Sequence, residues 1–314
     1  MRAIRVFAYG GPEVLVPVDL PEPRAGDGEV VIRAAAIDTI YVETQIRGGW
    51  GERFGVSPPY VPGGAAAGTV VAVGPGVSAS WVGRRVVAGA GTRGSYAEFV
   101  RTGVERVVPV PDGLGLREAA ALAHDGVTAM GILDGVGLGP GDRVLILGAA
   151  GGMGTLLVQL ARRHQAHVTG AARGVDKLAL VRRLGADAVV DYSVEGWTGA
   201  FEGWSVDVLL DGVGGTLGAE AFELVVDGGR VSAHGAASGE FAPVQAERGI
   251  RLRGIADVQF SAAEMVRLTA RALGEAAEGR ISPVIGREYP LSAAAEAHRA
   301  IEARSIAGKA LLIP

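Results

Sequence analysis

The chain has 314 residues, of which 48% are hydrophobic and 20% charged, and 30 basic against 34 acidic side chains leave a formal charge of −4. This composition is typical of a globular protein with two domains, and it excludes extensive disorder and a basic surface for nucleic acid. The absence of cysteine excludes disulfides and cysteine-based metal sites. Because no apolar run is long enough to span a membrane or form a signal-peptide core, we expect a cytoplasmic protein that binds neither membranes nor nucleic acid.

The first third of the sequence is β-rich. Short apolar, β-branched runs alternate with turn-forming segments such as LPEPRAGDGE and SPPYVPGG, which carry glycine and proline. The predicted strands are EVVIRAAAI (29–37), GTVVAVG (68–74), RRVVAGA (84–90) and YAEFV (96–100).

From Arg143 onward, strand candidates alternate with helical patterns. The strands are RVLIL, HVTGA, AVVDY, VDVLLD and GRVSAHG, and the intervening helices include GMGTLLVQLARRH and VDKLALVRRLG. This alternation predicts βαβ units on a parallel sheet. Two more helical segments, SAAEMVRLTARALGEAAEG and SAAAEAHRAIEARS, precede a final strand, GKALLIP.

The turn between RVLIL and the next helix is almost free of side chains. Its residues Ala149, Gly151 and Gly154 occupy the three positions of the dinucleotide-binding fingerprint, with alanine at the first. Gly151 would let the backbone approach a pyrophosphate at the helix N-terminus, and Gly154 would allow close contact between helix and sheet. The alternative is a glycine-rich turn that holds no ligand, but the βαβ context favours nucleotide binding.

The end of the second strand indicates which nucleotide binds. An NAD site would require an acidic residue there, whereas HVTGAARGVDK places Arg173, followed by Lys177, at this point. A guanidinium suits a 2′-phosphate, which favours NADPH. Asp176 is a rival acid that we place in the first turn of the following helix. The alternative is that Arg173 and Lys177 are solvated charges at a helix start.

Several segments together resemble the medium-chain dehydrogenase/reductase superfamily, and within it the zinc-independent quinone oxidoreductase branch, whose members are zeta-crystallin-like. They are YVETQIRGG, PPYVPGGAAAGTVVAVGPGV, GSYAEFV, DGVTAM, GPGDRVLILGAAGGMGTLLVQLAR, LGADAVVDY and GGRVSAHGAASG. The resemblance implies an α/β fold with a Rossmann doubly wound parallel sheet over residues 118–259. It also implies a GroES-like β-rich substrate lobe over 1–117, completed by 260–314, with the cofactor between the two. A homodimer is expected from the resemblance alone.

The resemblance also assigns cofactor contacts by position. Thr128 would touch the nicotinamide end, and the loop His234–Gly239 would lie beside the nicotinamide ribose. The cofactor-binding residues implied are Thr128, Ala150, Gly151, Gly152, Met153, Gly154, Arg173, Lys177, Tyr192, Gly214, His234, Gly235 and Ala236. Besides Arg173 and Lys177, two of these have an alternative: Tyr192 as a packing residue at a strand end, and Gly214 as part of a simple turn.

The acceptor side departs from the family. Ile40 and Gln45 stand where many relatives carry Asn and Tyr, so the catalytic residues are unknown from sequence. Asp38 and Tyr41 are candidates for the missing polar contacts, although we favour a turn-capping role for Asp38, and core packing is an equal alternative for Tyr41. The predicted acceptor pocket comprises Tyr41, Gln45, Trp50, Phe54 and Tyr60, of which the last three are equally interpretable as packing of the β-rich lobe.

The resemblance and the missing thiols imply a simple chemistry. We expect an NADPH-dependent, metal-independent reductase that transfers hydride to a small electron-poor acceptor, a quinone or a conjugated enone. The alternatives are an enoyl-thioester reductase of the enoyl-CoA or polyketide type, and a non-catalytic NADPH-binding sensor or structural protein. No metal site is expected because the five histidines are scattered, and a zinc-dependent alcohol dehydrogenase is disfavoured by the lack of cysteine.

Overall fold

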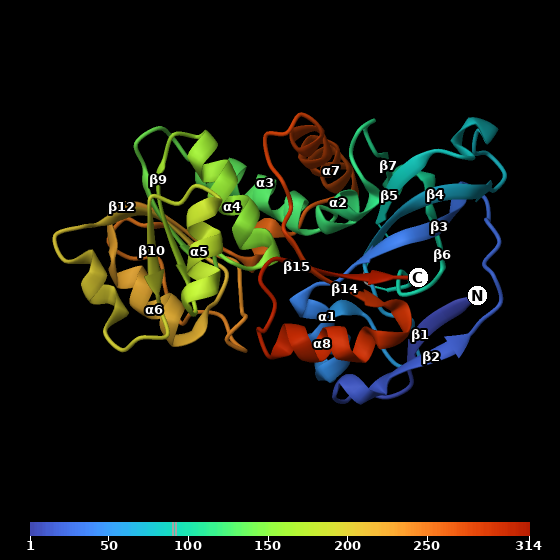
Figure 1. Cartoon of the computed structure of the whole chain (residues 1–314), viewed down its shortest axis with the longest axis horizontal. Coiled ribbons are helices and arrows are strands. Elements are labelled where there is room, and N and C mark those ends of the chain that lie inside the picture. Colours follow the sequence, from blue (N-terminus) through green and yellow to red (C-terminus); the bar gives the residue numbers. More distant parts are fainter. Residues whose placement is uncertain (90, 92) are drawn as a thin grey trace. The chain divides into compact units, whose positions relative to one another are not determined.

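The computed structural model describes residues 1–89, 91 and 93–314, which form two compact units (Figure 1). Unit 1 comprises Met1–Val127 and Ser261–Pro314, and unit 2 comprises Thr128–Phe260. The chain passes from unit 1 to unit 2 within helix α3 (Asp125–Val136), whereas the sequence places this boundary between residues 117 and 118. Among the described residues, no helix combines the length and the apolar character needed to cross a membrane.

Unit 1 is built on a seven-stranded sheet in which β14, β15, β3, β4, β5 and β7 follow one another and β6 pairs with β3. All pairings are antiparallel except that of β14 with β15. The strands are β3 (Glu29–Asp38), β4 (Ala65–Val73), β5 (Arg85–Gly89), β6 (Phe99–Gly103), β7 (Val107–Pro109), β14 (Ile285–Pro290) and β15 (Lys309–Ile313). A separate hairpin pairs β1 (Arg2–Val6) with β2 (Leu15–Asp19).

The core of unit 1 follows from the apolar run in β3. Val30 and Ile32 pack with residues of β4 and β5, whereas Ile37 joins a second cluster that includes Tyr96 and residues of the last helix. The helices of this unit are α1 (Tyr41–Gln45), α2 (Leu116–Ala121), α7 (Ala262–Ala277) and α8 (Ala294–Glu302). A capping box of Ser261 and Glu264 begins α7.

Unit 2 is a six-stranded parallel sheet with the order β10-β9-β8-β11-β12-β13. Its strands are β8 (Arg143–Leu147), β9 (His167–Ala172), β10 (Ala188–Asp191), β11 (Val206–Asp211), β12 (Val225–Ala233) and β13 (Arg251–Gly254). Helices α4 (Gly152–Arg163) and α5 (Val175–Arg183) pack on β8–β10, and α6 (Gly215–Glu223) packs on β11 and β12. Strand order reverses between β8 and β11, which is the topological switch point of dinucleotide-binding sheets.

The predicted fold class, a parallel α/β sheet with a β-rich lobe, is confirmed. Strands β8 and β11 span the residues that the sequence predicts. Strand β4 begins at Ala65, before the predicted start at Gly68, because three alanines that look neutral in sequence all pair with β5, and two of them, Ala66 and Ala67, also pair with β3. The end of the predicted strand RRVVAGA, Ala90, lies outside the described residues.

Candidate functional site

The turn after β8 brings α4 against the end of its own strand. Gly148 adopts a left-handed conformation with φ of 73°, and Ala149 and Ala150 are buried. A Cβ on Gly154 would overlap the carbonyl oxygen of Gly148 and lie 2.8 Å from the Cα atom of Ala149. Glycine at 154 is therefore required by close packing of the turn, which is the role that its position in the fingerprint predicts.

The N-terminus of α4 is open to an anion. Gly151, the N-cap residue, is exposed and has no side chain to cap the helix. The Thr155 N–H donates to the Gly151 carbonyl, at 2.9 Å. The N–H groups without a capping side chain are therefore those of the residues before Thr155, in the first turn of α4. A Cβ on Gly151 would have only the Gly148 carbonyl oxygen nearby, at 3.3 Å. Uncapped N–H groups, the positive end of the helix dipole and a bare approach together suit a pyrophosphate.

The loop after β11 lies beside this turn. A Cβ on Gly148 would be 3.3 Å from Val213 Cγ2, so the two loops meet at the switch point. Buried Asp211 holds the β11 loop because its Oδ1 accepts the N–H groups of Val213 and Gly214, both at 2.8 Å. Burial raises the pKa of Asp211, and these two hydrogen bonds only partly oppose that rise.

A third loop, residues 234–241, crosses the β11 loop. Gly214 has a φ of 73°, and a Cβ there would overlap the carbonyl oxygen of Glu240. A Cβ on Gly235 would overlap the backbone of Gly212. Within unit 2 the structure thus brings together three loops that the sequence analysis assigns to the cofactor, and glycine is required where they cross.

The His234 side chain belongs to the interior of unit 2. Its Nδ1 lies 3.0 Å from the Ser232 hydroxyl, and burial lowers its pKa to about 4, so the imidazole is neutral at physiological pH. Of the other predicted contacts in this unit, Thr128 on α3 and Ala236 are half-buried.

The residues predicted to hold a 2′-phosphate follow β9 and β10. Arg173 is exposed directly after β9, and Lys177 lies in the first turns of α5. Asp176 occupies the first turn of α5, where a carboxylate favours the helix dipole. Tyr192 is half-buried and packs against the core of unit 2, as in its packing alternative.

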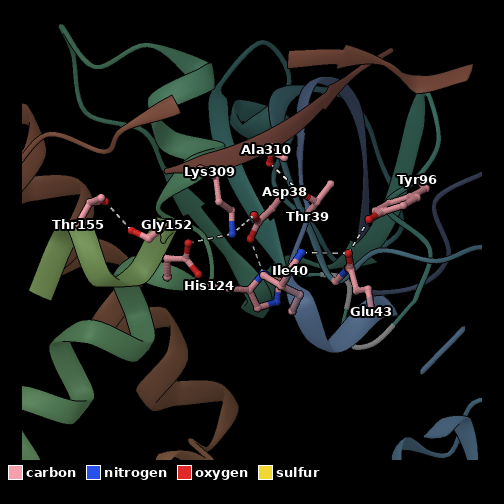
Figure 2. A network of polar contacts seen from close by, with 12 residues as sticks. Asp38, Thr39, Ile40, Glu43, Tyr96, His124, Gly152, Thr155, Lys309 and Ala310 are labelled. Carbon is pink, nitrogen blue, oxygen red and sulfur yellow. Dashed lines mark hydrogen bonds and ion pairs between the residues drawn. The ribbon is translucent and has the colours of Figure 1, made fainter. Parts of the chain in front are cut away.

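Unit 1 contains a cluster of ionisable side chains that we name the Asp38 network: Asp38, His124, Asp125 and Lys309 (Figure 2). Lys309 Nζ lies 2.6 Å from Asp38 Oδ1 and 3.0 Å from Asp125 Oδ2, and His124 Nδ1 lies 2.6 Å from Asp38 Oδ2. Asp38 is fully buried and Lys309 nearly so. The favoured turn-capping role of Asp38 is therefore wrong, because its carboxylate is committed to two side chains.

Strand pairing builds the Asp38 network. Antiparallel pairing of β15 with β3 sets Leu311 opposite Asp38, so Lys309, two residues earlier on the same face, is a diagonal neighbour of Asp38. The Thr39 hydroxyl donates to the Ala310 carbonyl at 2.8 Å and fixes this register (Figure 2). Since buried charges require partners, the cation and the carboxylates of this network depend on one another.

The pKa values of the network's side chains are shifted in different directions. Burial would raise the pKa of Asp38, but the Lys309 ammonium and His124 hold it below its ordinary value. Burial would lower the pKa of Lys309, but Asp125 and Asp38 raise it. Burial raises the pKa of Asp125 despite the nearby ammonium. The ammonium and the Asp38 carboxylate are thus both stabilised as ions.

A second group of buried side chains, Glu43, Tyr96 and His298, is connected by hydrogen bonds near the Asp38 network. Glu43 accepts hydrogen bonds from the Gly64 N–H at 3.0 Å and from the Tyr96 hydroxyl at 2.6 Å, and Tyr96 lies 2.9 Å from His298 Nε2. Burial raises the pKa of Glu43 to about 7, against the hydrogen bond from Tyr96. Burial and the charge of Arg47 lower the pKa of His298 to about 3, so that ring is neutral.

The predicted acceptor residues lie in one stretch of unit 1 but differ in exposure. Tyr41 and Gln45, the first and last residues of α1, are half-buried. Trp50 is half-buried beneath the Arg53 guanidinium, 4.6 Å from its ring centre, and Phe54 is exposed. Tyr60 is a core residue of this unit, as in the packing interpretation.

The partners of Asp38 were not predicted from the sequence. The signal available was a lysine within the otherwise apolar segment GKALLIP, because a cation in a buried strand requires a counter-charge. His124 and Asp125, adjacent polar residues between the apolar stretches ALA and GVTAM, carry a similar signal.

Comparisons with known proteins agree with both units. Residues 26–112 match the family model described as an alcohol dehydrogenase GroES-like domain, and residues 184–312 match that described as a zinc-binding dehydrogenase. The quinone oxidoreductase of Rattus norvegicus is 33% identical, over 96% of this chain and 94% of that protein. The 2-haloacrylate reductase of a Burkholderia species is 30% identical, over 100% and 99%.

The structure also resembles that of a mycobacterial protein solved in complex with NADPH. The TM-score is 0.91 at 33% identity, and the match covers 100% of both chains. With the parallel sheet, the β-rich lobe and relatives of this identity along the whole length, the chain belongs to the quinone oxidoreductase family of medium-chain dehydrogenase/reductase enzymes.

Proposed function

We propose that the protein is an NADPH-dependent reductase that transfers hydride to a quinone or a conjugated enone. The observation that carries this proposal is the uncapped N-terminus of α4, which follows a side-chain-free turn at the switch point of the sheet. The mycobacterial relative solved with NADPH supports the same cofactor.

The residues of unit 2 fit this cofactor. Gly151, Gly152 and Met153 would hold the pyrophosphate through backbone N–H groups, and Arg173 with Lys177 would contact the 2′-phosphate through their charges. When bound, NADPH supplies a hydride and so carries the difficult part of the chemistry. The protein contributes orientation and proton management.

The acceptor class rests on the relatives and on hydride chemistry. A quinone and an activated alkene both present a carbonyl-conjugated electrophile that accepts hydride directly, and the two curated relatives are named for reductions of these kinds. An enoyl thioester has the same conjugated unit and is the second candidate.

Zinc-independence, a further part of the proposal, is supported by the absence of cysteine from the sequence and is checked by metal analysis of the purified protein. The homodimer expected from the resemblance is checked by sedimentation.

The deciding experiment is the anaerobic rate of NADPH oxidation against matched panels of ortho-quinones, para-quinones, alkyl enones and enoyl-CoA esters, each corrected for its uncatalysed background. We expect saturable turnover with quinones or enones. Saturation only with enoyl-CoA esters would identify the thioester alternative. NADPH binding without turnover on any panel would contradict the proposal and favour a sensor or structural role.

A further inference from the structure

We propose that His124 is the proton donor of the reduction and that Asp38 is the residue that positions it. This inference deepens the proposed function and rests on it. It concerns only unit 1, in which every contact invoked below is found.

The orientation of the His124 ring is fixed by Asp38. The distance of 2.6 Å between Nδ1 and Asp38 Oδ2 is that of a charge-assisted hydrogen bond, with the Nδ1–H donating. Asp38 is itself immobile because it is fully buried and bound to Lys309 through its other oxygen (Figure 2). The ring therefore presents Nε2, not Nδ1, as its exchangeable site.

The His124 side chain is partly exposed. The His124 side chain is 30% exposed, whereas Asp38 is 0% exposed, so the dyad is buried at the carboxylate end and open at the imidazole. Within the ranges that the structure describes, no hydrogen bond to Nε2 is found. A proton on Nε2 is thus free to pass to a small acceptor, which a hydrogen-bonded structural histidine could not do without losing its partner.

Glycine at position 64 leaves room for the ring. A Cβ on Gly64 would lie 2.9 Å from both Cε1 and Nε2 of His124, closer than side chains normally approach. The Gly64 N–H donates to Glu43, so the backbone beside the imidazole is itself held in place. The space next to His124 is accordingly defined by backbone rather than by a side chain.

The surrounding charges favour the imidazolium. The ring faces Asp38 from β3, Glu43 from α1 and Lys309 from β15, with Asp125 following it in the chain. Burial alone would lower the pKa of His124, but the hydrogen bond and the charge of Asp38 outweigh it and raise that pKa above the ordinary value. A larger fraction of the rings is therefore protonated at neutral pH than for a free histidine.

The proton balance of the step is simple. The acceptor gains the hydride at one carbon or at a carbonyl group, and its remaining negative charge, on an oxygen or an enolate carbon, takes the proton of His124 Nε2. The N–H bond breaks, its electron pair stays on the imidazole, and an O–H or C–H bond forms. Water then returns a proton to Nε2, with Asp38 holding the ring throughout.

The test compares His124→Gln with His164→Gln. His164 is a matched control because it is exposed on unit 2 and belongs neither to the Asp38 network nor to the hydrogen-bonded group of Glu43, Tyr96 and His298. With an alkyl enone we expect His124→Gln to lower kcat by about 100-fold, the usual contribution of a general acid, and to leave the dissociation constant of NADPH within about twofold. The loss with a quinone should be smaller, because water protonates a hydroquinone oxygen more readily than a carbon. The control should keep wild-type kcat.

The pH profile separates proton donation from a structural role. In the wild type kcat should fall as pH rises through the pKa of His124, because the acid must be protonated, and this limb should vanish in His124→Gln. Nitrogen-15 NMR of the ring supplies a readout that needs no turnover: His124 should titrate above 6.5 in the wild type, and at lower pH in Asp38→Asn.

Three results would overturn the proposal: a wild-type ring that titrates at or below 6.5, an unchanged kcat in His124→Gln, or a retained pH limb in that variant. If Asp38→Asn does not fold, the wild-type titration and the His124→Gln profile still decide. Wild-type protein that reduces no acceptor would refute the proposed function and the proton-donor role with it, whereas a wild type that turns over normally beside an unaffected His124→Gln would refute only the present inference.

Discussion

The pyrophosphate turn of unit 2 and the Asp38 network of unit 1 are built by opposite means. The turn uses backbone from seven consecutive residues, 148–154, and works because side chains are absent. The network uses charged side chains of three segments, with Lys309 lying 271 positions after Asp38 in the chain, and it works because each charge has a neighbouring partner of opposite sign. A site made of backbone depends on the close packing that the absence of side chains permits. A site made of charged side chains depends on each charge keeping a partner of opposite sign.

The largest effect should follow from removing the cation of the network. Lys309→Met leaves buried Asp38 and half-buried Asp125 without an ammonium, and breaking a buried pair such as Asp38–Lys309 costs about 3–5 kcal/mol of the free energy of unfolding. Urea unfolding measures this loss. The control is Arg101→Met, which breaks an exposed pair with Glu29 in the same unit and should cost less than about 1 kcal/mol. Equal losses of unfolding free energy in the two variants would show that the Asp38 network contributes no more to stability than an exposed ion pair.

A smaller effect should follow from adding one methyl group to the turn. Gly154→Ala forces a Cβ against the backbone of Gly148 and Ala149, which we expect to cost about 1–3 kcal/mol of stability and to weaken NADPH binding at least about tenfold. Gly199→Ala is the control in unit 2, because a Cβ there meets nothing within 4 Å. Thermal unfolding and a binding titration test both parts, and unchanged NADPH affinity in a folded Gly154→Ala would show that the turn does not hold the pyrophosphate.

The smallest effect concerns the choice of nucleotide. Arg173→Ala removes an exposed charge, so stability should be unchanged, while the preference for NADPH over NADH should fall about tenfold, or about 1.4 kcal/mol. The ratio of the two dissociation constants, in the wild type and the variant, is the measurement. A constant ratio would leave the 2′-phosphate without its proposed partner.

These two regions also show what a single sequence can predict. Gly151 and Gly154 are recognisable because the strand, the turn and the apolar stripe of α4 are consecutive, so local pattern contains the whole motif. Asp38 could be identified as a polar residue at a strand end, but not as half of a dyad, because its partners depend on the pairing of β15 with β3 and on the turn before α3. Buried electrostatics is a tertiary property, and no spacing rule in the sequence encodes it.

The position of Lys309 has a consequence for biosynthesis. Unit 2 is one continuous segment that ends at Phe260, so all of it is made before α7, α8 and β15. Asp38 and Asp125 are made earlier still, yet their ammonium arrives only with β15. Because domains fold as units while the chain emerges, we expect unit 2 to fold first and unit 1 to remain open until its last strand is available. Unit 1 would then complete its fold only after synthesis of Lys309, the residue that balances the charges of the Asp38 network.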